Sequence, residues 1–363
     1  MKLIFEGHDY RYAVEQSLLA FFPNERPVYD GEDANLARVG LAVEGQTAHA
    51  ATSLTVGGKT AEGTAQADIS AALDDYGRER LKQRAVKLSF FEAARSLTGV
   101  TPAWGALTGI RPAKLAAGML AEGLSEEETD RILRDTYYVS SSRRTLCLPC
   151  AKAGLEAKRG LSRDEISLYV GIPFCPTRCA YCSFVSNSVE KSFHLVEPYL
   201  QALLAEVDSA AKMVEELGLR VKSFYMGGGT PTTLTAGQMD RLLGRLQEKF
   251  ALSNAVELTV EAGRPDTITA EKLAVLKKNG VTRVSVNPQS MDDRVLAAIG
   301  RRHSGDDIRA AMALVGQAGF PHVNMDLIAG LPEDTPERFR RTLDEVIAFG
   351  TDNITIHTLS LKK

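Results

Sequence analysis

Three cysteines stand close together near the middle of the chain: Cys175, Cys179 and Cys182, at the spacing C-x3-C-x2-C. Three thiolates on one loop can hold three corners of a cubane iron–sulfur cluster and leave its fourth iron without a protein ligand. An open iron of this kind can bind a small molecule through an amino and a carboxylate group. S-adenosylmethionine offers both groups beside a sulfonium that one electron can cleave. The spacing therefore predicts a cluster that serves radical chemistry.

A structural zinc site is the alternative use of these cysteines. Such sites take four Cys or His ligands, and the nearest spare ligand, His194, lies twelve residues after Cys182. The sequence further along favours the cluster, because glycine-rich and polar residues follow each of several predicted strands. We therefore expect a [4Fe-4S] cluster at the three cysteines.

The surrounding residues resemble a known motif. The run from Tyr169 to Cys182 reads Tyr-Val-Gly-Ile-Pro-Phe-Cys-Pro-Thr-Arg-Cys-Ala-Tyr-Cys. It is similar to the radical S-adenosylmethionine (radical SAM) motif, with Tyr181 in the aromatic place. Tyr169 together with Ile-Pro-Phe-Cys resembles the oxygen-independent coproporphyrinogen III oxidase family. The long N-terminal part resembles the HemZ branch of that family.

Segments typical of strands and helices alternate after about residue 160. We predict strands at 167–172, 223–226, 256–261, 283–287, 323–327 and 353–358, with helices at about 195–217, 236–250, 270–279, 305–318 and 336–349. This alternation is typical of a parallel sheet with right-handed crossovers. We therefore expect an α/β fold, a partial (β/α)6 TIM-type barrel over residues 161–363, which is the usual core of radical SAM enzymes.

Candidate site residues recur where these strands end. The cysteine loop follows the first strand, Gly227 to Pro231 follows the second, Glu261 ends the third, Asn287 to Gln289 ends the fourth, and Asp326 lies near the end of the fifth. In a barrel the carboxyl ends of the strands meet at one rim, where active sites form. The sequence therefore predicts one site from five separate segments.

The resemblance assigns roles to these residues. It implies that S-adenosylmethionine is contacted by Tyr169, Tyr181, Gly228, Gly229, Thr230, Glu261, Gln289, Arg301 and Asp326. Glycines let the chain pass close to a ligand, and a fixed carboxylate such as Glu261 can accept hydrogen bonds from a ribose. Arg302 is an alternative to Arg301 for holding a carboxylate. No acid–base pair is expected, because the cofactors carry the chemistry.

Residues 1–160 predict a smaller α+β domain of unknown role. A strand at 2–5, a helix at 10–22, a meander at 36–43, 47–56 and 59–69, and helices at about 76–98, 111–121, 125–136 and 140–159 are expected. Cys147 and Cys150 form a C-x2-C pair that is too small for a four-thiolate site. Basic residues from Arg111 to Lys114 and at 143–144 favour a solvated helix surface, with propionate or RNA binding as the alternative.

The composition bounds the class of protein. A chain of 363 residues with 44% hydrophobic and 25% charged residues is long enough for two globular domains. A net charge of −3 gives no general attraction to nucleic acid or anionic membranes. The first eight residues include charge and do not form a secretory signal, and no apolar run is long enough to span a bilayer. Five cysteines in two short runs fit reduced, cytoplasmic thiols.

The resemblance also implies a reaction. An external one-electron donor would reduce the cluster, S-adenosylmethionine would yield a 5′-deoxyadenosyl radical, and the radical would take a hydrogen from a propionate of coproporphyrinogen III. Loss of carbon dioxide and one electron would leave a vinyl group. We therefore expect an oxidoreductase of porphyrin and haem biosynthesis that acts on a tetrapyrrole.

Three departures from the family pattern keep other functions open. Phe184 stands where coproporphyrinogen oxidases carry a fourth cysteine, and Gly171 stands where they carry a histidine. The chain also ends at Leu359-Ser-Leu-Lys-Lys363, so we expect a truncated chain without the last helix and the C-terminal domain of the family. The alternatives are a haem chaperone similar to HemW, a radical SAM enzyme acting on RNA, and a non-catalytic remnant.

Overall fold

The computed structural model describes residues 1–70, 72–108 and 111–359. The chain divides into two compact units, Met1–Leu161 and Ser162–Lys363, and each is built around hydrophobic clusters of its own. None of the described helices is both long and apolar enough to cross a membrane. Gly109 and Ile110, which precede the basic segment that begins at Arg111, and the last four residues of the chain lie outside the described ranges.

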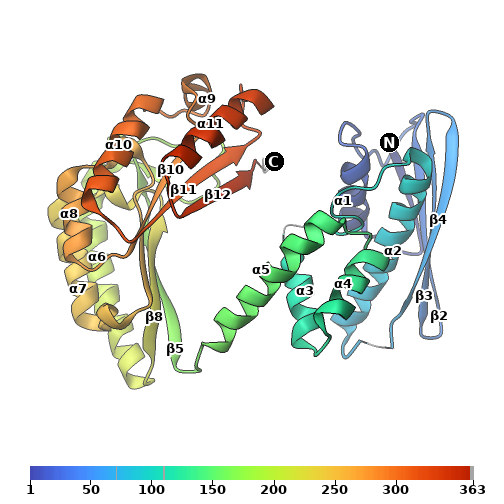
Figure 1. Ribbon diagram of the computed structural model, residues 1–363, viewed down its shortest axis with the longest axis horizontal. Helices are drawn as coiled ribbons and strands as arrows, with labels where there is room; N and C mark the ends of the chain where they lie inside the picture. The colour runs from blue at the N-terminus through green and yellow to red at the C-terminus, as the bar shows by residue number, and fades with distance from the viewer. Residues whose placement is uncertain (71, 109–110, 360–363) are drawn as a thin grey trace. The chain divides into compact units, whose positions relative to one another are not determined.

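The first unit begins with a four-stranded sheet of order β1-β2-β3-β4 (Figure 1). Its elements are β1 (Lys2–Glu6), α1 (Arg11–Phe21), β2 (Leu36–Glu44), β3 (Thr47–Val56), β4 (Lys59–Asp68) and α2 (Asp75–Thr98). β1 pairs with β2 in parallel, and the other pairs are antiparallel, as the predicted meander requires. α2 packs on β3 and β4, where Gly63 comes so close to the helix that a β carbon would lie 2.2 Å from the carbonyl of Ser89.

Three further helices complete the first unit: α3 (Pro112–Ala121), α4 (Glu126–Asp135) and α5 (Ser141–Arg159). The predicted capping box holds the start of α4, because Ser125 and Glu128 exchange hydrogen bonds. Cys147 and Cys150 both lie on α5, the first buried in the helical core and the second exposed. Arg144 is paired with Asp130 at 2.7 Å, so it is not a free basic surface group.

The second unit has six parallel strands in the order β12-β11-β10-β9-β8-β5. Its elements are β5 (Glu165–Ile172), β6 (Phe174–Cys175), β7 (Asn187–Ser188), α6 (Val189–Glu216), β8 (Arg220–Gly228), α7 (Ala236–Phe250), β9 (Glu257–Glu261), α8 (Ala270–Lys278), β10 (Arg283–Gln289), α9 (Asp293–Ala298), α10 (Gly305–Ala318), β11 (His322–Ala329), α11 (Pro336–Ala348) and β12 (Asn353–Thr358), with short 3-10 turns at Pro231–Thr233, Leu252–Asn254 and Pro265–Thr267. Each strand is followed by at least one helix until β12. The predicted partial (β/α)6 barrel is confirmed.

The two faces of this sheet differ in chemistry. Helices α6, α7, α8 and α10 cover one face (Figure 1), and the strand side chains facing them are apolar and buried, among them Phe224, Val260 and Met325. Side chains at the alternate positions point to the other face, because successive strand residues face opposite sides. Those positions carry Tyr225, Glu261 and other polar groups, so the open face of the sheet is polar.

Two small features of the second unit, a strand pair and a short helix, were absent from the sequence prediction. β6 and β7 form a two-stranded parallel pair, in which Cys175 lies opposite Ser188. This pair joins the two ends of the cysteine loop. α9 adds a short helix after β10, and its N-terminus is capped by Asp292. Both elements are too short to show a periodic pattern in sequence.

Candidate active site

One cavity of about 730 Å³ lies on the polar face of the barrel and extends from the amino ends to the carboxyl ends of the strands. It contains every site residue predicted from the sequence: Cys175, Cys179 and Cys182 of the loop, and Tyr169, Tyr181, Gly228, Gly229, Thr230, Glu261, Gln289, Arg301 and Asp326. These residues come from five strands and the segments that follow them. The structure therefore brings the whole predicted set to one place.

The glycine segment after β8 lies directly beside the first cysteine. A β carbon on Gly229 would be 2.6 Å from the carbonyl oxygen of Phe174 and 3.0 Å from the Sγ atom of Cys175, so only glycine fits. Gly228 has a φ of +106°, which other residues rarely adopt. The hydroxyl of Thr230 donates to the Sγ of Cys175 over 3.5 Å. The segment thus forms a cradle against the thiol.

Burial raises the pKa of the Cys175 thiol, and the hydrogen bond from Thr230 partly offsets this effect. A thiol in such surroundings is deprotonated by binding iron rather than by its own acidity. Among the described residues, no three Cys, His, Asp or Glu side chains converge on a single metal ion. A cubane distributes its thiolates over separate irons, so its ligands need not converge on one point. The donor set therefore fits a cluster.

Tyr181, the aromatic residue of the loop, accepts a hydrogen bond from Arg301. The guanidinium is 7% exposed, donates to the Tyr181 hydroxyl over 3.1 Å and also to the backbone carbonyl of Asn287. Burial raises the pKa of Tyr181 to about 12, so its hydroxyl stays protonated. Arg302, the alternative candidate, faces outward and pairs with Glu190. Arg301 is thus the one of the two that reaches the cavity.

Gln289 shows backbone strain at the end of β10. Its φ is +70°, and the strand register shifts between Val286 and Gln289. Its side-chain Oε1 is buried and has no hydrogen-bond partner within the described part of the chain. Strained, unsatisfied residues cluster at functional sites. Gln289 is therefore a group that can accept a hydrogen bond from a ligand in the cavity.

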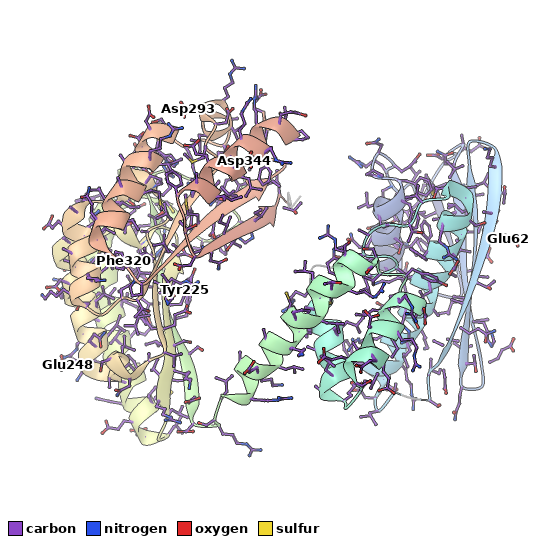
Figure 2. The ribbon with its side chains drawn as sticks, viewed as in Figure 1. Glu62, Tyr225, Glu248, Asp293, Phe320 and Asp344 are labelled. Atoms are coloured by element: carbon purple, nitrogen blue, oxygen red, sulfur yellow. The ribbon has the colours of Figure 1, made fainter. Side chains whose placement is uncertain are left out.

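A second strip of polar side chains runs across β5, β8 and β9. The rings of Tyr169 and Tyr225 stack with centroids 6.0 Å apart, and the Tyr225 hydroxyl donates to Glu261 Oε1 over 2.5 Å. Figure 2 shows Tyr225 on the sheet, whereas Glu248 lies on α7, one of the helices that cover the other face of the sheet. Burial raises the pKa of Glu261, and the negative charge of Asp326 raises it further. The hydrogen bond from Tyr225 acts in the opposite direction and lowers that pKa.

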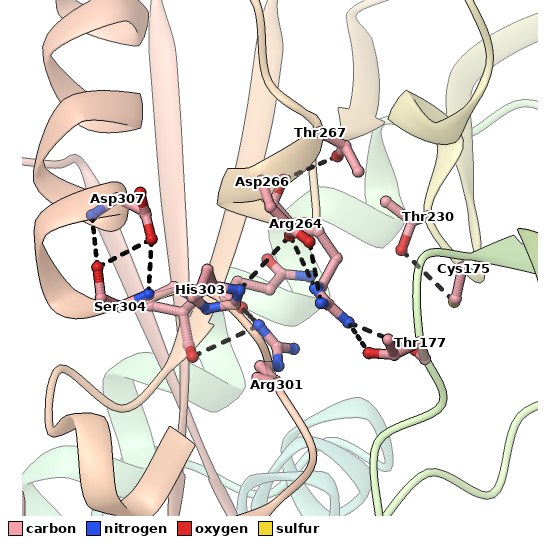
Figure 3. A network of polar contacts seen from close by, with 12 residues as sticks. Cys175, Thr177, Thr230, Arg264, Asp266, Thr267, Arg301, His303, Ser304 and Asp307 are labelled. Atoms are coloured by element: carbon pink, nitrogen blue, oxygen red, sulfur yellow. Dashed lines mark hydrogen bonds and ion pairs between the residues drawn. The ribbon is translucent and has the colours of Figure 1, made fainter. Parts of the chain in front are cut away.

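A buried network anchors the cysteine loop to the barrel (Figure 3). Arg264, which is 3% exposed, donates to both carboxylate oxygens of Asp266 over 3.0 and 3.1 Å. Its remaining nitrogen donates to the Thr177 hydroxyl over 3.1 Å, and Thr177 donates in turn to the carbonyl of Gly300 over 3.1 Å. One arginine therefore ties the middle of the cysteine loop to the segment after β9.

His303 adds a neutral group to this network. Burial lowers its pKa, so the imidazole is uncharged near pH 7. Its Nδ1 lies 3.5 Å from Asp266 Oδ1, which is longer than a normal hydrogen bond. Burial acts to raise the pKa of Asp266, yet its polar contacts and the Arg264 charge hold that pKa at about 2. We assign the compensating charge to Arg264, whose geometry is bidentate.

The sequence analysis missed several of these residues, among them Tyr225, Arg264 and Asp266. Tyr225 stands two positions before Gly227 in a predicted strand, so its alternation with the glycine would have placed it on the cavity face. Arg264 and Asp266 occur in a loop, where no periodic pattern distinguishes an ion pair that holds the structure together from solvated charges. Their role is visible only when the cysteine loop and the segment after β9 are seen together.

Residues 169–346 match the family model described as "Radical SAM superfamily". This second unit is therefore a radical SAM domain. The cofactors of that superfamily, a [4Fe-4S] cluster and S-adenosylmethionine, are those predicted from the cysteine loop.

Several proteins that are similar to this chain have names that refer to haem or to coproporphyrinogen. The chain is 40% identical over 291 residues to the oxygen-independent coproporphyrinogen-III oxidase-like protein HemZ of Bacillus subtilis, covering 79% of this chain and 58% of that protein. It is 35% identical to the haem chaperone HemW of Mycobacterium tuberculosis over 54% of this chain and 50% of that protein. The solved coproporphyrinogen III oxidase HemN of Escherichia coli, described as a radical SAM enzyme, is 32% identical with a TM-score of 0.50, covering 58% of this chain and 47% of that one.

The extents of these matches differ. The HemZ match is longer than the second unit, so the similarity reaches into the first unit. The HemW match has the length of the second unit alone. The chain spans about half the length of the curated relatives it matches.

Proposed function

We propose that this chain is a radical SAM oxidoreductase that acts on a tetrapyrrole, in the manner of a coproporphyrinogen dehydrogenase. The observation that carries the proposal is the convergence of the three cysteines, the glycine cradle and the polar strand ends on one cavity of about 730 Å³. The HemZ relative, at 40% identity, supports the tetrapyrrole assignment.

The residues of the chain have separate tasks in this proposal. Cys175, Cys179 and Cys182 would hold the cluster, and the cradle at Gly228 and Gly229 would bring backbone groups within reach of S-adenosylmethionine. When bound, a reduced cluster supplies the electron that cleaves S-adenosylmethionine and yields a 5′-deoxyadenosyl radical. The protein must position the hydrogen donor and exclude water, since it contributes no acid–base step.

Glu261 is proposed to accept the ribose hydroxyls of S-adenosylmethionine. Glu261→Gln should weaken S-adenosylmethionine binding about tenfold, because one charge-assisted hydrogen bond is worth about 1.4 kcal/mol or more. Binding requires the ionised carboxylate, whose pKa burial raises. Affinity of the unchanged protein should therefore increase as pH rises through that raised pKa, and the Glu261→Gln protein should lack this dependence. Equilibrium dialysis with S-adenosylmethionine at several pH values measures both effects.

Glu257→Gln is the matched control. Glu257 lies on the same strand and lines the same cavity, but it faces Arg283 at the other end of β9. The control should bind S-adenosylmethionine as the unchanged protein does. Equal weakening by both substitutions would show that Glu261 acts only through the net charge of the cavity.

One experiment tests the function as a whole. The cluster is reconstituted without oxygen, and S-adenosylmethionine and a strong one-electron reductant are added with or without coproporphyrinogen III. We expect 5′-deoxyadenosine in both samples, with an increase of about tenfold or more when the porphyrinogen is present, together with a vinyl product. Absence of 5′-deoxyadenosine would end the enzyme proposal. Formation that ignores the porphyrinogen would move the proposal to another substrate.

A haem chaperone is the second candidate function, and one observation favours it. Phe184, in the place of the family's fourth cysteine, lines the cavity and is 67% exposed. An exposed aromatic ring at this place suits a flat apolar ligand such as haem. Tight haem binding without any turnover of coproporphyrinogen III would decide for the chaperone.

A further inference from the structure

The first unit contains a cavity of about 490 Å³ that is separate from the radical SAM domain. Its walls come from α2, from the start of α3, and from residues 106–108 between them. A volume of this size is typical of small-molecule sites. Nothing in the proposed radical chemistry uses it.

The charge on its walls is all of one sign. Arg80, Arg84 and Lys87 lie at spacings of four and three residues on α2, so they share one face of the helix. Arg111, at the N-terminal end of α3, adds a fourth cation from another wall. Among the described residues that line the cavity, none is acidic.

The other basic residues of α2 show a different pattern. Several are paired with an acid three residues away: Arg78 with Asp75, Lys82 with Glu79 and Arg95 with Glu92. The ion pairs formed by the described part of the chain include none to Arg80, Arg84 or Lys87. The cations of α2 that are paired with acids therefore lie outside the cavity lining, whereas the cations that line the cavity have no acidic partner among the described residues.

Two polar groups at the cavity are also buried without a partner. The Nε of Arg84 and the hydroxyl of Thr108 are out of contact with solvent and make no hydrogen bond within the described ranges. Burial lowers the pKa of Lys87, and no acid raises it. Like charges four residues apart on a helix destabilise it, and the partial burial of Arg84 and Lys87 without an acidic partner adds to this cost. An anion in the cavity would relieve each of these conditions.

The rest of the lining is apolar. Leu81, Leu88, Leu115 and the ring of Tyr137 complete the walls. A free inorganic ion would leave this surface unused, whereas a molecule with an apolar or aromatic body would cover it. We propose that this cavity binds a small molecule that carries at least two carboxylate or phosphate groups on an apolar or aromatic body.

Titration of the full chain with two probes tests the proposal and distinguishes the two possible kinds of anionic group on the ligand, carboxylates and phosphates. Coproporphyrin III, a stable tetrapyrrole with four carboxylates, represents the first, and adenosine triphosphate represents the second. We expect one probe to bind, and its affinity should fall about 100-fold in a protein with both Arg84→Gln and Lys87→Gln, since each charge-assisted contact is worth about tenfold. Arg111→Gln, on another wall, should weaken binding about tenfold by the same reasoning.

The control changes the same helix away from the cavity. The double substitution Arg78→Gln with Lys82→Gln changes the net charge by the same amount, but its two cations are already paired with acids. It should leave binding unchanged. Without a probe, the Arg84→Gln, Lys87→Gln protein should unfold at the same or a higher temperature, because it loses only repulsion. This readout distinguishes lost recognition from a damaged fold.

Cys179→Ser and Arg283→Gln keep the test independent of the proposed radical chemistry. Both change the barrel cavity, so binding in the first unit should survive them even if the enzyme function is wrong. The proposal is overturned if neither probe binds, or if binding depends on the barrel substitutions and not on those at Arg84, Lys87 and Arg111.

Discussion

Cys179→Ser should abolish both the cluster and the cleavage of S-adenosylmethionine. A serine hydroxyl does not ionise as a thiol does when it meets iron, so the cube would keep only Cys175 and Cys182. We expect the iron content to fall from about four atoms per chain to nearly none. 5′-Deoxyadenosine should decrease by at least about 100-fold, equivalent to about 2.7 kcal/mol in activation free energy. Iron analysis, visible absorbance and chromatography of the products measure these changes.

Cys150→Ser provides the matched control. Cys150 is an exposed cysteine on α5 in the first unit, so the substitution makes the same chemical change outside the barrel cavity. Its iron content and 5′-deoxyadenosine should equal those of the unchanged protein. If Cys150→Ser lost the cluster, the C-x2-C pair would have a metal role that we do not assign to it. If Cys179→Ser kept the cluster, our ligand assignment would be wrong.

Most of the barrel could be predicted from sequence because its pattern is repetitive. Each strand of the second unit has apolar residues facing the helices, and each helix between strands has apolar residues at helical spacing. The site could be predicted for the same reason. Once the strands were placed, Glu261 and Asp326 had to meet at one rim, since parallel strands end on the same side of the sheet.

The parts that could not be predicted depend on contacts between loops. The positive φ of Gln289 depends on a register shift beside Pro288 that no local pattern encodes. The pairing of β6 with β7 joins residues separated by the whole cysteine loop. The cationic cavity of the first unit combines α2 with Arg111, which the sequence analysis interpreted as part of a solvated helix surface. In each case the deciding neighbour is distant along the chain.

The pair of buried Arg264 and partly exposed Asp266 gives the second large effect. Arg264→Met should lower the free energy of unfolding of the second unit by about 2 kcal/mol, because the carboxylate of Asp266, whose side chain is 29% exposed, loses two charge-assisted hydrogen bonds. It should also reduce cluster loading, since Thr177 loses its tether to Arg264. The only tryptophan, Trp104, lies in the first unit. Hydrogen exchange of peptides from the second unit is therefore the appropriate measurement. Arg245→Met, on an exposed pair with Asp208, is the control and should change little.

The pH dependence identifies the charge that is responsible. The folded pKa of Asp266 is about 2 and its ordinary value is 3.8. Because solvent screens this partly exposed carboxylate, the pair stabilises the fold above pH 4 by about 1 kcal/mol, and this contribution is lost as pH falls toward 2. In the Arg264→Met protein, burial of Asp266 is no longer opposed by the guanidinium, so its pKa should rise. The acid-induced loss of stability should then begin at a higher pH.

A double substitution separates stability from loop positioning. Arg264→Met with Asp266→Asn removes both charges, so no unpaired carboxylate remains at the partly exposed position 266. Stability should therefore return most of the way to that of the unchanged protein. Cluster loading should stay low, because nothing replaces the hydrogen bond from Arg264 to Thr177. If loading recovered together with stability, the pair would act only on the fold, and the cysteine loop would be positioned by Tyr181 and Arg301 without help from Arg264.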